Sequence, residues 1–193
     1  MSTGGSRWRS RRTGWGAVLL VALGSLVACS GAQASPKRPV GSAAVSAVAQ
    51  AAGGACQLFD FDGVAQTLGV RFDMAAAAQQ GETFSCVLGQ NTASYPDLTL
   101  AVTPTTVDPP GYRTAVQPPG AVAVPDLGRI GYRRPVPALS GDSGPGVEVG
   151  WLAGNGRLIM LQFRFAPNAT DADVAALTPK LIALARFIDE SSL

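Results

Sequence analysis

Two pairs of closely spaced carboxylates are the first residues in this sequence whose types could do chemistry. Asp60 lies two positions before Asp62, and Asp171 lies two positions before Asp173. Paired carboxylates catalyse hydrolysis when one donates a proton and the other accepts one. Each pair also lies at the start of a predicted helix, where acidic side chains accept hydrogen bonds from free backbone amides. We therefore expect these side chains to cap helices.

A glycine- and serine-rich segment, residues 140–146, is the second candidate. Its Gly-Asp-Ser-Gly stretch resembles the segment around the nucleophile of trypsin-like proteases. That nucleophile needs a histidine to accept its proton, and the sequence has no histidine. We therefore expect a flexible loop here, a protein that is not an enzyme, and no cofactor or metal.

Aromatic and basic residues alternate in the middle of the chain, where they could form a ligand site. Arginine binds phosphate through its planar fork, and tyrosine offers a ring face and a hydroxyl, so an anionic headgroup or a sugar would fit. The alternative is solvated arginines beside ordinary strand tyrosines. Trp151 is either a core anchor or a ligand platform. The candidate residues are Tyr112, Arg113, Tyr132, Arg133, Arg134 and Trp151.

The N-terminal residues 1–28 have the pattern of an export signal. Residues 1–12 are polar and arginine-rich, whereas residues 14–28 carry no charge. This apolar run is shorter than the ~20 residues of a membrane-spanning helix. It ends in Leu-Val-Ala-Cys29, which resembles a bacterial lipobox, so we expect a lipid on Cys29 and anchoring to the cell membrane on its extracytoplasmic face. The alternatives are a plain signal peptide and, for the route, twin-arginine export.

The two remaining cysteines, Cys56 and Cys86, are expected to form a disulfide outside the cytoplasm. The alternative is a catalytic thiol, which would need a base and a reducing compartment, and neither is available. Closing a loop of about 30 residues should stabilise the fold by roughly 3 to 4 kcal/mol in the chain-entropy model.

Composition limits the size of the fold and its partners. The chain has 193 residues, 47% of them hydrophobic, which is enough for one packed core and too few for two full domains. Four of its 15 basic residues precede position 29, so the rest of the chain has a formal charge of −2. A basic surface for nucleic acid is therefore not expected.

The chain after the signal divides into a tether and one domain. Residues 29–54 are built mainly from small residues and proline, and such a segment cannot bury enough surface to fold. We expect it to reach roughly 25 to 30 Å as a flexible chain. Residues 55–193 are expected to form a single disulfide-bonded domain.

The first half of this domain predicts one helix and two strands. Asp60 is a good N-cap and Gly69 a good C-terminal residue for an amphipathic helix between them. Residues 83–88 read as a strand that carries Cys86, and residues 98–103 alternate apolar and polar side chains as a strand does.

The second half predicts a hairpin and a long helix. Proline and glycine are dense in residues 104–145, so regular structure there must be short. Residues 147–152 and 158–165 flank a turn segment suited to a hairpin. Residues 171–190 carry the apolar stripe of a helix, which Pro179 should kink or divide at Thr178. The expected class is α+β, an antiparallel sheet with an N-terminal short helix and a C-terminal helix on one face.

Together these features resemble the small actinobacterial lipoproteins grouped as domains of unknown function. The features are the lipobox, the tether, Cys56-x-Leu-Phe before an Asp-capped helix, Cys86, the Leu-Gly-x-x-Gly stretch of residues 127–131, the hairpin and the terminal helix. Arginine also greatly outnumbers lysine, as in high-GC genomes. The resemblance implies location and fold rather than an activity.

Three functions are compatible with the sequence. The first is a non-catalytic envelope lipoprotein that is anchored to the membrane through Cys29 and recognises an envelope protein or a small ligand. The second is a carrier with an apolar cavity between helix and sheet for a lipid, suggested by the strongly apolar residues 158–165. An enzyme that relies on carboxylates alone is the third.

Overall fold

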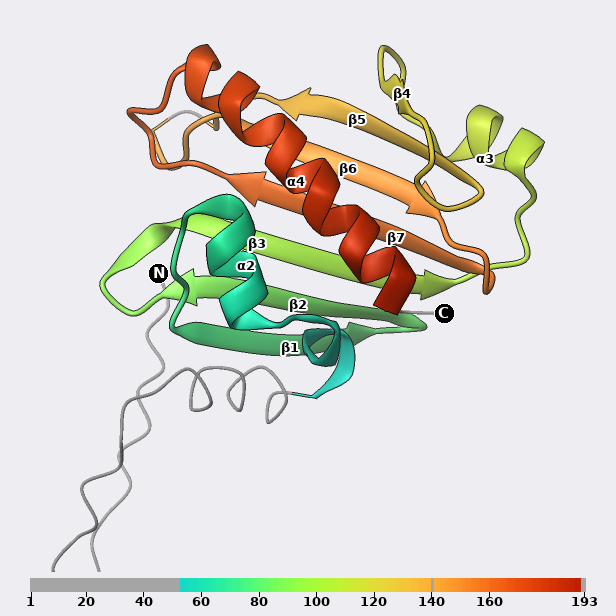
Figure 1. Ribbon diagram of the computed structural model, residues 1–193, viewed down its shortest axis with the longest axis horizontal. Helices are drawn as coiled ribbons and strands as arrows, with labels where there is room; N and C mark the ends of the chain where they lie inside the picture. Colours follow the sequence, from blue (N-terminus) through green and yellow to red (C-terminus); the bar gives the residue numbers. More distant parts are fainter. Residues whose placement is uncertain (1–52, 140, 192–193) are drawn as a thin grey trace, which may run out of the picture. The chain divides into compact units, whose positions relative to one another are not determined.

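A seven-stranded antiparallel sheet is the centre of the computed structural model, which describes residues 53–139 and 141–191. Its strands lie in the order β1-β2-β3-β7-β6-β5-β4 (Figure 1). The strands are β1 (Met74–Gln80), β2 (Thr83–Gln90), β3 (Ala93–Pro104), β4 (Val122–Val124), β5 (Ile130–Val136), β6 (Gly146–Leu152) and β7 (Arg157–Arg164). The helices are η1 (Gly54–Leu58), α2 (Phe61–Leu68), α3 (Pro109–Ala115) and α4 (Asp171–Ser191). The predicted signal peptide and all but the last two residues of the predicted tether lie outside the described residues.

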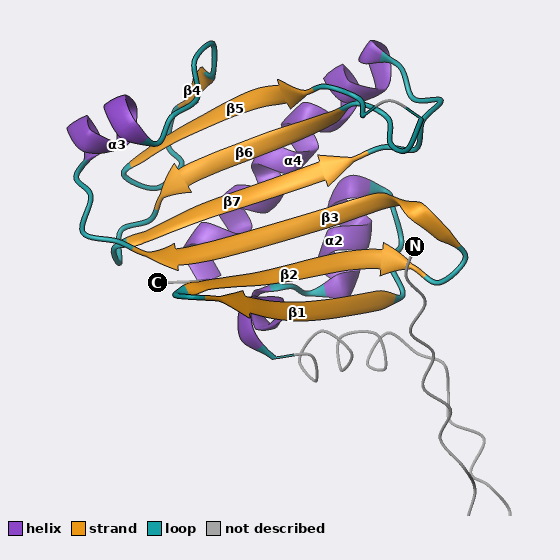
Figure 2. Cartoon of the chain, turned by 180° about the vertical axis from the view of Figure 1, so that it is seen from behind, coloured by secondary structure: helices purple, strands orange, loops and turns teal. Residues whose placement is uncertain are grey.

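Two helices, α2 and α4, cover one face of this sheet. Figure 1 shows them in front of the strands, and Figure 2, from behind, shows the strands in front of them. The core lies in this layer, where Leu98 and Leu100 of β3 pair with Phe163 and Leu161 of β7, all fully buried. The predicted α+β class is therefore confirmed. Within residues 53–139 and 141–191, no helix is both long and apolar enough to cross a membrane.

The short helix α2 forms where its end signals predict it. The Asp60 carboxylate accepts hydrogen bonds from the backbone amides of Asp62 (3.3 Å) and Gly63 (3.2 Å), which satisfies two of the free amides at the helix start. Gly69 ends the helix in the left-handed region at φ 76°, a conformation that glycine adopts without strain. The first carboxylate pair thus caps a helix, as predicted.

The predicted hairpin is formed by β6 and β7. Side chains of β7 alternate between the two faces of the sheet. Ile159, Leu161 and Phe163 are buried on the helix-covered face, whereas Leu158 and Met160 lie on the opposite face and are partly buried. The apolar run of β7 therefore supplies both faces of the sheet.

The C-terminal helix α4 begins at a capping box. The Asp173 carboxylate accepts hydrogen bonds from the amide and hydroxyl of Thr170 (2.8 and 2.7 Å), and the Thr170 hydroxyl accepts one from the Asp173 amide (3.3 Å). The hydrogen bonds from the Thr170 amide and hydroxyl lower the pKa of Asp173. The second carboxylate pair is likewise used at a helix start.

Pro179 does not divide α4, so the prediction of a second segment at Thr178 is wrong. The helix runs without a break from Asp171 to Ser191 with Pro179 inside it. Proline costs one backbone hydrogen bond in a helix, but Pro179 is exposed, and the neighbouring Leu177 and Leu181 are buried against the sheet. Burial of the apolar stripe holds the helix together across this position.

One edge of the sheet, strand β1, has no counterpart in the sequence prediction. Its residues, Met-Ala-Ala-Ala-Ala-Gln-Gln, lack the alternation of apolar and polar side chains that marks a strand. The strand pairs with β2 along its whole length, from Met74 opposite Gly89 to Gln80 opposite Thr83. Pairing with a neighbour, rather than local preference, determines this strand.

The predicted disulfide is confirmed. Cys56 of η1 and Cys86 of β2 are bonded and fully buried, with their Cα atoms 4.9 Å apart. The bond fastens the segment before α2 to the central part of β2, on the helix-covered face of the sheet. The start of the domain is therefore covalently fixed to its core.

Candidate functional site

The face of the sheet opposite α2 and α4, here called the open face, carries the candidate site. A cross-strand row on it runs from Ala101 of β3 through Met160 of β7 and Gly150 of β6 to Tyr132 of β5. Tyr112 of α3 packs against Tyr132 with ring centroids 6.1 Å apart. The two tyrosines therefore form an aromatic wall at one end of this row.

Tyr132 belongs to a buried polar network with Glu148 and Arg134. The Tyr132 hydroxyl donates to Glu148 Oε1 at 2.8 Å. Arg134 Nε and Nη2 donate to Glu148 Oε1 and Oε2 at 2.8 and 2.7 Å. Glu148 is only 3% exposed, and a buried carboxylate needs such partners. Burial and the hydrogen bond to Glu148 raise the pKa of Tyr132, and the same carboxylate raises the pKa of Arg134.

Tyr112 is buried without a hydrogen-bond partner. It lies on the short helix α3, whose start is capped by Asp108 through a hydrogen bond from the Gly111 amide (2.9 Å). The residue is 1% exposed, and within the described part of the chain its hydroxyl is the buried side-chain polar atom that lacks a partner. Burial, Tyr132 and Glu148 together raise its pKa above the ordinary value of 10.0. A buried hydroxyl of this kind costs about 1 to 3 kcal/mol unless something binds it.

A pocket of about 210 Å³ lies between α3 and the open face, and Tyr112 is one of the residues that line it. We call it the α3 pocket. Gly150 gives the Tyr132 ring its place there, because a Cβ added at Gly150 would lie only 2.6 Å from ring carbons of Tyr132. The residues that line the α3 pocket are Ala101, Thr103, Tyr112, Val116, Tyr132, Gly150, Trp151, Leu158, Ile159 and Met160.

Three of the six candidate residues come together, and two do not. Tyr112, Tyr132 and Arg134 belong to the cluster on the open face. Arg113 is exposed on α3. Arg133 projects from the other face of β5, since it lines a hollow with residues of α4. Adjacent arginines on one strand point to opposite faces.

The sixth candidate, Trp151, is an anchor of the core. It is 0% exposed, and its Nε1 donates to Asp189 Oδ1 of α4 at 2.9 Å. The Trp151 ring therefore lies on the helix-covered face of the sheet. The residue borders the α3 pocket only because its strand, β6, passes beside the pocket. The indole joins β6 to the last turns of α4.

Glu148 is the residue of the cluster that sequence reasoning missed. It is a single carboxylate within the otherwise uncharged strand β6, of which every residue is buried. A charge in such a strand needs a partner on a neighbouring strand. A single charged residue in an uncharged strand could therefore have predicted a buried ion pair. The identity of the partner depends on the register between β5 and β6.

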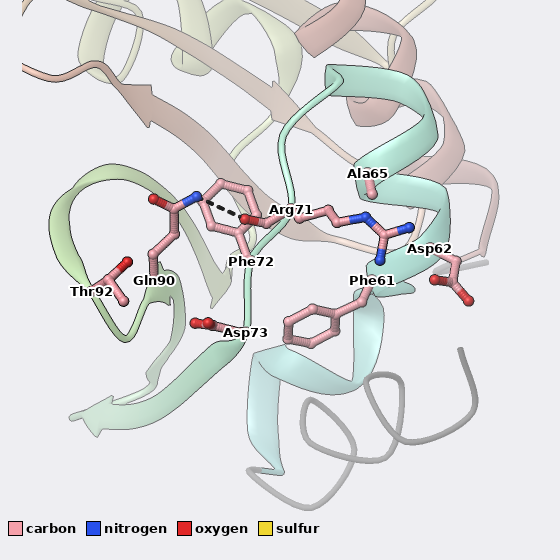
Figure 3. Close-up of a pocket in the computed structure, with 8 residues that line it drawn as sticks. All are labelled: Phe61, Asp62, Ala65, Arg71, Phe72, Asp73, Gln90 and Thr92. Carbon is pink, nitrogen blue, oxygen red and sulfur yellow. Dashed lines mark hydrogen bonds between the residues drawn. The ribbon is translucent and has the colours of Figure 1, made fainter. Parts of the chain in front are cut away.

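A second hollow, of about 340 Å³, lies between α2 and the turn that joins β2 to β3 (Figure 3). Two of its polar side chains already bind the protein, because Gln90 Nε2 donates to the Arg71 carbonyl (2.9 Å) and Asp73 Oδ1 accepts from the Asn91 amide (2.7 Å). In Figure 3 the Arg71 side chain extends across toward α2, on the side of Phe61 and Asp62. The α3 pocket is the stronger candidate, since its lining residues are mainly apolar and aromatic and none has a charged side chain.

The glycine- and serine-rich loop contributes to folding rather than to a site. Ser143 is 2% exposed and accepts a hydrogen bond from Arg164 Nη1 at 3.3 Å. Among the described residues there is also no group of three or more cysteine, aspartate or glutamate side chains placed to hold a metal ion. The α3 pocket therefore offers a ligand its shape and its apolar and aromatic side chains.

Comparisons of this chain with protein-family models, with curated proteins and with solved structures find no match.

Proposed function

We propose that this chain is a lipid-anchored lipoprotein of the cell envelope, not an enzyme, which recognises a small ligand in the α3 pocket. Residues 1–28 direct export, Cys29 carries the lipid, and the tether holds the domain near the outer face of the membrane. The lipobox pattern and the disulfide outside the cytoplasm both support this location. The resemblance to small actinobacterial lipoproteins adds support for the anchor.

The uncharged lining of the α3 pocket is the observation that carries the binding proposal. Its lining residues are mainly apolar and aromatic and none has a charged side chain. This is the usual composition of a small-molecule site.

Native mass spectrometry tests the binding proposal. The mature chain, exported by a bacterial host, is weighed under native conditions and again after denaturation. We expect an added mass that disappears on denaturation and that is lost in Ala101→Leu, which fills the α3 pocket, but kept in Arg113→Ala. A bare mass in every sample would contradict ligand binding and favour recognition of an envelope protein.

Metabolic labelling tests the anchor separately. Cells that express the chain are fed an alkyne fatty acid, and labelled protein is detected after coupling to a fluorophore. The chain should be labelled and sediment with membranes, and Cys29→Ala should lose both properties. Label that persists in Cys29→Ala would place the lipid elsewhere.

A carrier of an apolar ligand is the second candidate, and a groove between η1 and the sheet favours it. The groove measures about 340 Å³ and is lined largely by apolar side chains, among them Leu58, Phe84 and Val102. Phe84 is 37% exposed there, so an acyl chain could cover it. Phe84→Ser should then release lipid that extracts with the purified protein, whereas Val87→Ser, on the other face of β2, should not.

A further inference from the structure

We infer that the ligand of the groove between η1 and the sheet, here called the η1 groove, is a single-chain amphiphile with an anionic head group, of the fatty-acid type. This inference rests on the carrier proposal above, because it assigns the chemical class of the apolar ligand at that site. It follows from three features of the η1 groove: its apolar floor, the cation at one end and its size.

The floor of the η1 groove is an apolar strip on the helix-covered face of the sheet. Phe84 of β2 lies opposite Val102 of β3, and both residues line the groove together with Leu58 of η1. The Phe84 ring lies beside the start of η1, because a Cβ added at Gly54 would be 3.9 Å from Phe84 Cδ1. Phe84 remains 37% exposed, and an apolar chain laid on this strip would remove that surface from water.

Arg157 supplies a cation at one end of this strip. It is the first residue of β7 and lies opposite Pro104, the last residue of β3. Two positions further along β7 is Ile159, which is buried on the helix-covered face and pairs with Val102. Because side chains alternate along a strand, Arg157 lies on the same face as Ile159. The register therefore places the Arg157 side chain on the face where the η1 groove lies, and Arg157 is one of its lining residues.

The charge of Arg157 is not balanced within the described chain. The ion pair there is that of Arg134 with Glu148, whereas Arg157 is exposed. Among the described residues that line the η1 groove, none has a carboxylate, and Gln57 is the other residue with a polar side chain. The Arg157 guanidinium can therefore donate hydrogen bonds to an anionic head group, and it would repel a cationic one.

The size of the η1 groove fits one chain. A water molecule occupies about 30 Å³ in the liquid and a methylene group is of similar size, so a groove of about 340 Å³ holds roughly ten chain carbons and a small head group. A phospholipid has two longer chains, for which the groove is too small. An apolar strip with a cation at one end is therefore complementary to a single chain with an anion at one end.

Three matched probes test the class. Decanoate, 1-decanol and decyltrimethylammonium share a ten-carbon chain and differ in the charge of the head group. Binding is measured by protein-detected NMR on the whole mature chain, residues 29–193 with Cys29→Ser, exported behind a plain signal peptide so that no lipid or detergent competes for the probes. We expect decanoate to bind about fivefold more tightly than 1-decanol, from its charged hydrogen bonds with Arg157, and decyltrimethylammonium to bind more weakly than either.

Two pairs of variants locate the binding. Arg157→Gln should lose the preference for decanoate over 1-decanol while both still bind, whereas Arg113→Gln, at an exposed position on α3, should keep it. Phe84→Ser should weaken the binding of all three probes by more than about fivefold. Val87→Ser, at a 39% exposed position on the other face of β2, should change none of them. Thermal unfolding checks that each variant is folded.

The outcomes separate the ligand class from the carrier proposal. Binding of 1-decanol as tight as that of decanoate, or a preference for decanoate that survives Arg157→Gln, would overturn the anionic class. If no probe binds but lipid that copurifies with the chain is lost in Phe84→Ser, the class fails and the carrier proposal stands. If no probe binds and no lipid copurifies, both fail.

Discussion

Arg134 and Glu148 face each other across β5 and β6, and two nitrogens of the guanidinium lie within 2.8 Å of the carboxylate oxygens. The two groups are not equally buried, since the side chain of Arg134 is 36% exposed and the side chain of Glu148, taken without its backbone, is 5% exposed. Arg134 therefore binds a buried carboxylate while part of its own side chain is exposed to solvent on the open face. The Tyr132 hydroxyl completes the pair from the side of the α3 pocket.

Removing Arg134 should destabilise the domain more than removing its neighbour. Arg134→Ala leaves a buried carboxylate without its cation, which we expect to cost about 2 to 3 kcal/mol, below the ~3–5 kcal/mol of a fully buried pair because Arg134 is partly exposed. Arg133→Ala, on the opposite face of β5, should cost less than about 1 kcal/mol. Urea unfolding measures the free energy of unfolding of both variants. Equal losses in the two variants would show that the ion pair with Glu148 does not stabilise the domain.

Replacing Tyr112 should make the free protein more stable. Tyr112→Phe removes a buried hydroxyl that has no partner within the described chain, so we expect the free energy of unfolding to rise by about 1 kcal/mol. Tyr132→Phe is the control, because it breaks a hydrogen bond to Glu148 and should lower stability by a similar amount. Thermal unfolding of the ligand-free chain measures both. A loss of stability in Tyr112→Phe would mean that its hydroxyl is satisfied.

Stability should fall steeply in alkaline solution because both tyrosines resist ionisation. Burial raises the pKa of Tyr112 and Tyr132 far above the ordinary value of 10.0. The unfolded chain releases these protons near pH 10 and the folded chain does not, so their contribution is complete below pH 10 and is lost as the pH rises further. Absorbance at 295 nm should show both ionising only as the domain unfolds. Ionisation of either near pH 10 in the folded chain would contradict this.

Reducing the disulfide should lower stability by roughly 3 to 4 kcal/mol, since the bond closes a loop with a sequence separation of 30. Urea unfolding of the same chain with and without dithiothreitol measures the difference. The double variant Cys56→Ala/Cys86→Ala is the control and should be insensitive to the reductant. A free-thiol assay on denatured, unreduced chain should find neither cysteine, and a positive reaction would contradict the bond.

Elements whose signals are local could be predicted from the sequence, and elements defined by distant pairing could not. Asp60 and Gly69 enclose α2 within ten residues, so both of its ends can be read directly. The alanine-rich β1 becomes a strand only because β2 lies beside it. Tyr112 and Tyr132 were candidates by residue type. Their contact depends on α3 packing against the same face of the sheet on which the Tyr132 side chain of β5 lies. Arg133 and Arg134 could be separated only once the register of β5 was known.

The last prediction concerns Asp189, which ties three parts of the chain together. Its Oδ1 accepts from Trp151 Nε1 at 2.9 Å, and its Oδ2 accepts from the Gly128 amide at 3.2 Å. Asp189→Ala leaves the buried indole N–H unpaired and frees the segment before β5, so we expect a loss of about 2 kcal/mol. Glu190→Ala, at an exposed position next to it, should change stability by less than about 0.5 kcal/mol.

Trp151 itself reports this contact. Trp8 and Trp15 lie in the predicted signal peptide, so Trp151 is the one tryptophan of the processed chain. In Asp189→Ala its emission should shift in wavelength or intensity while the protein is still folded, because the indole loses a charged partner in the core. Glu190→Ala should leave the spectrum unchanged. An unaltered spectrum and an unaltered unfolding midpoint in Asp189→Ala would show that packing alone holds α4 on β6.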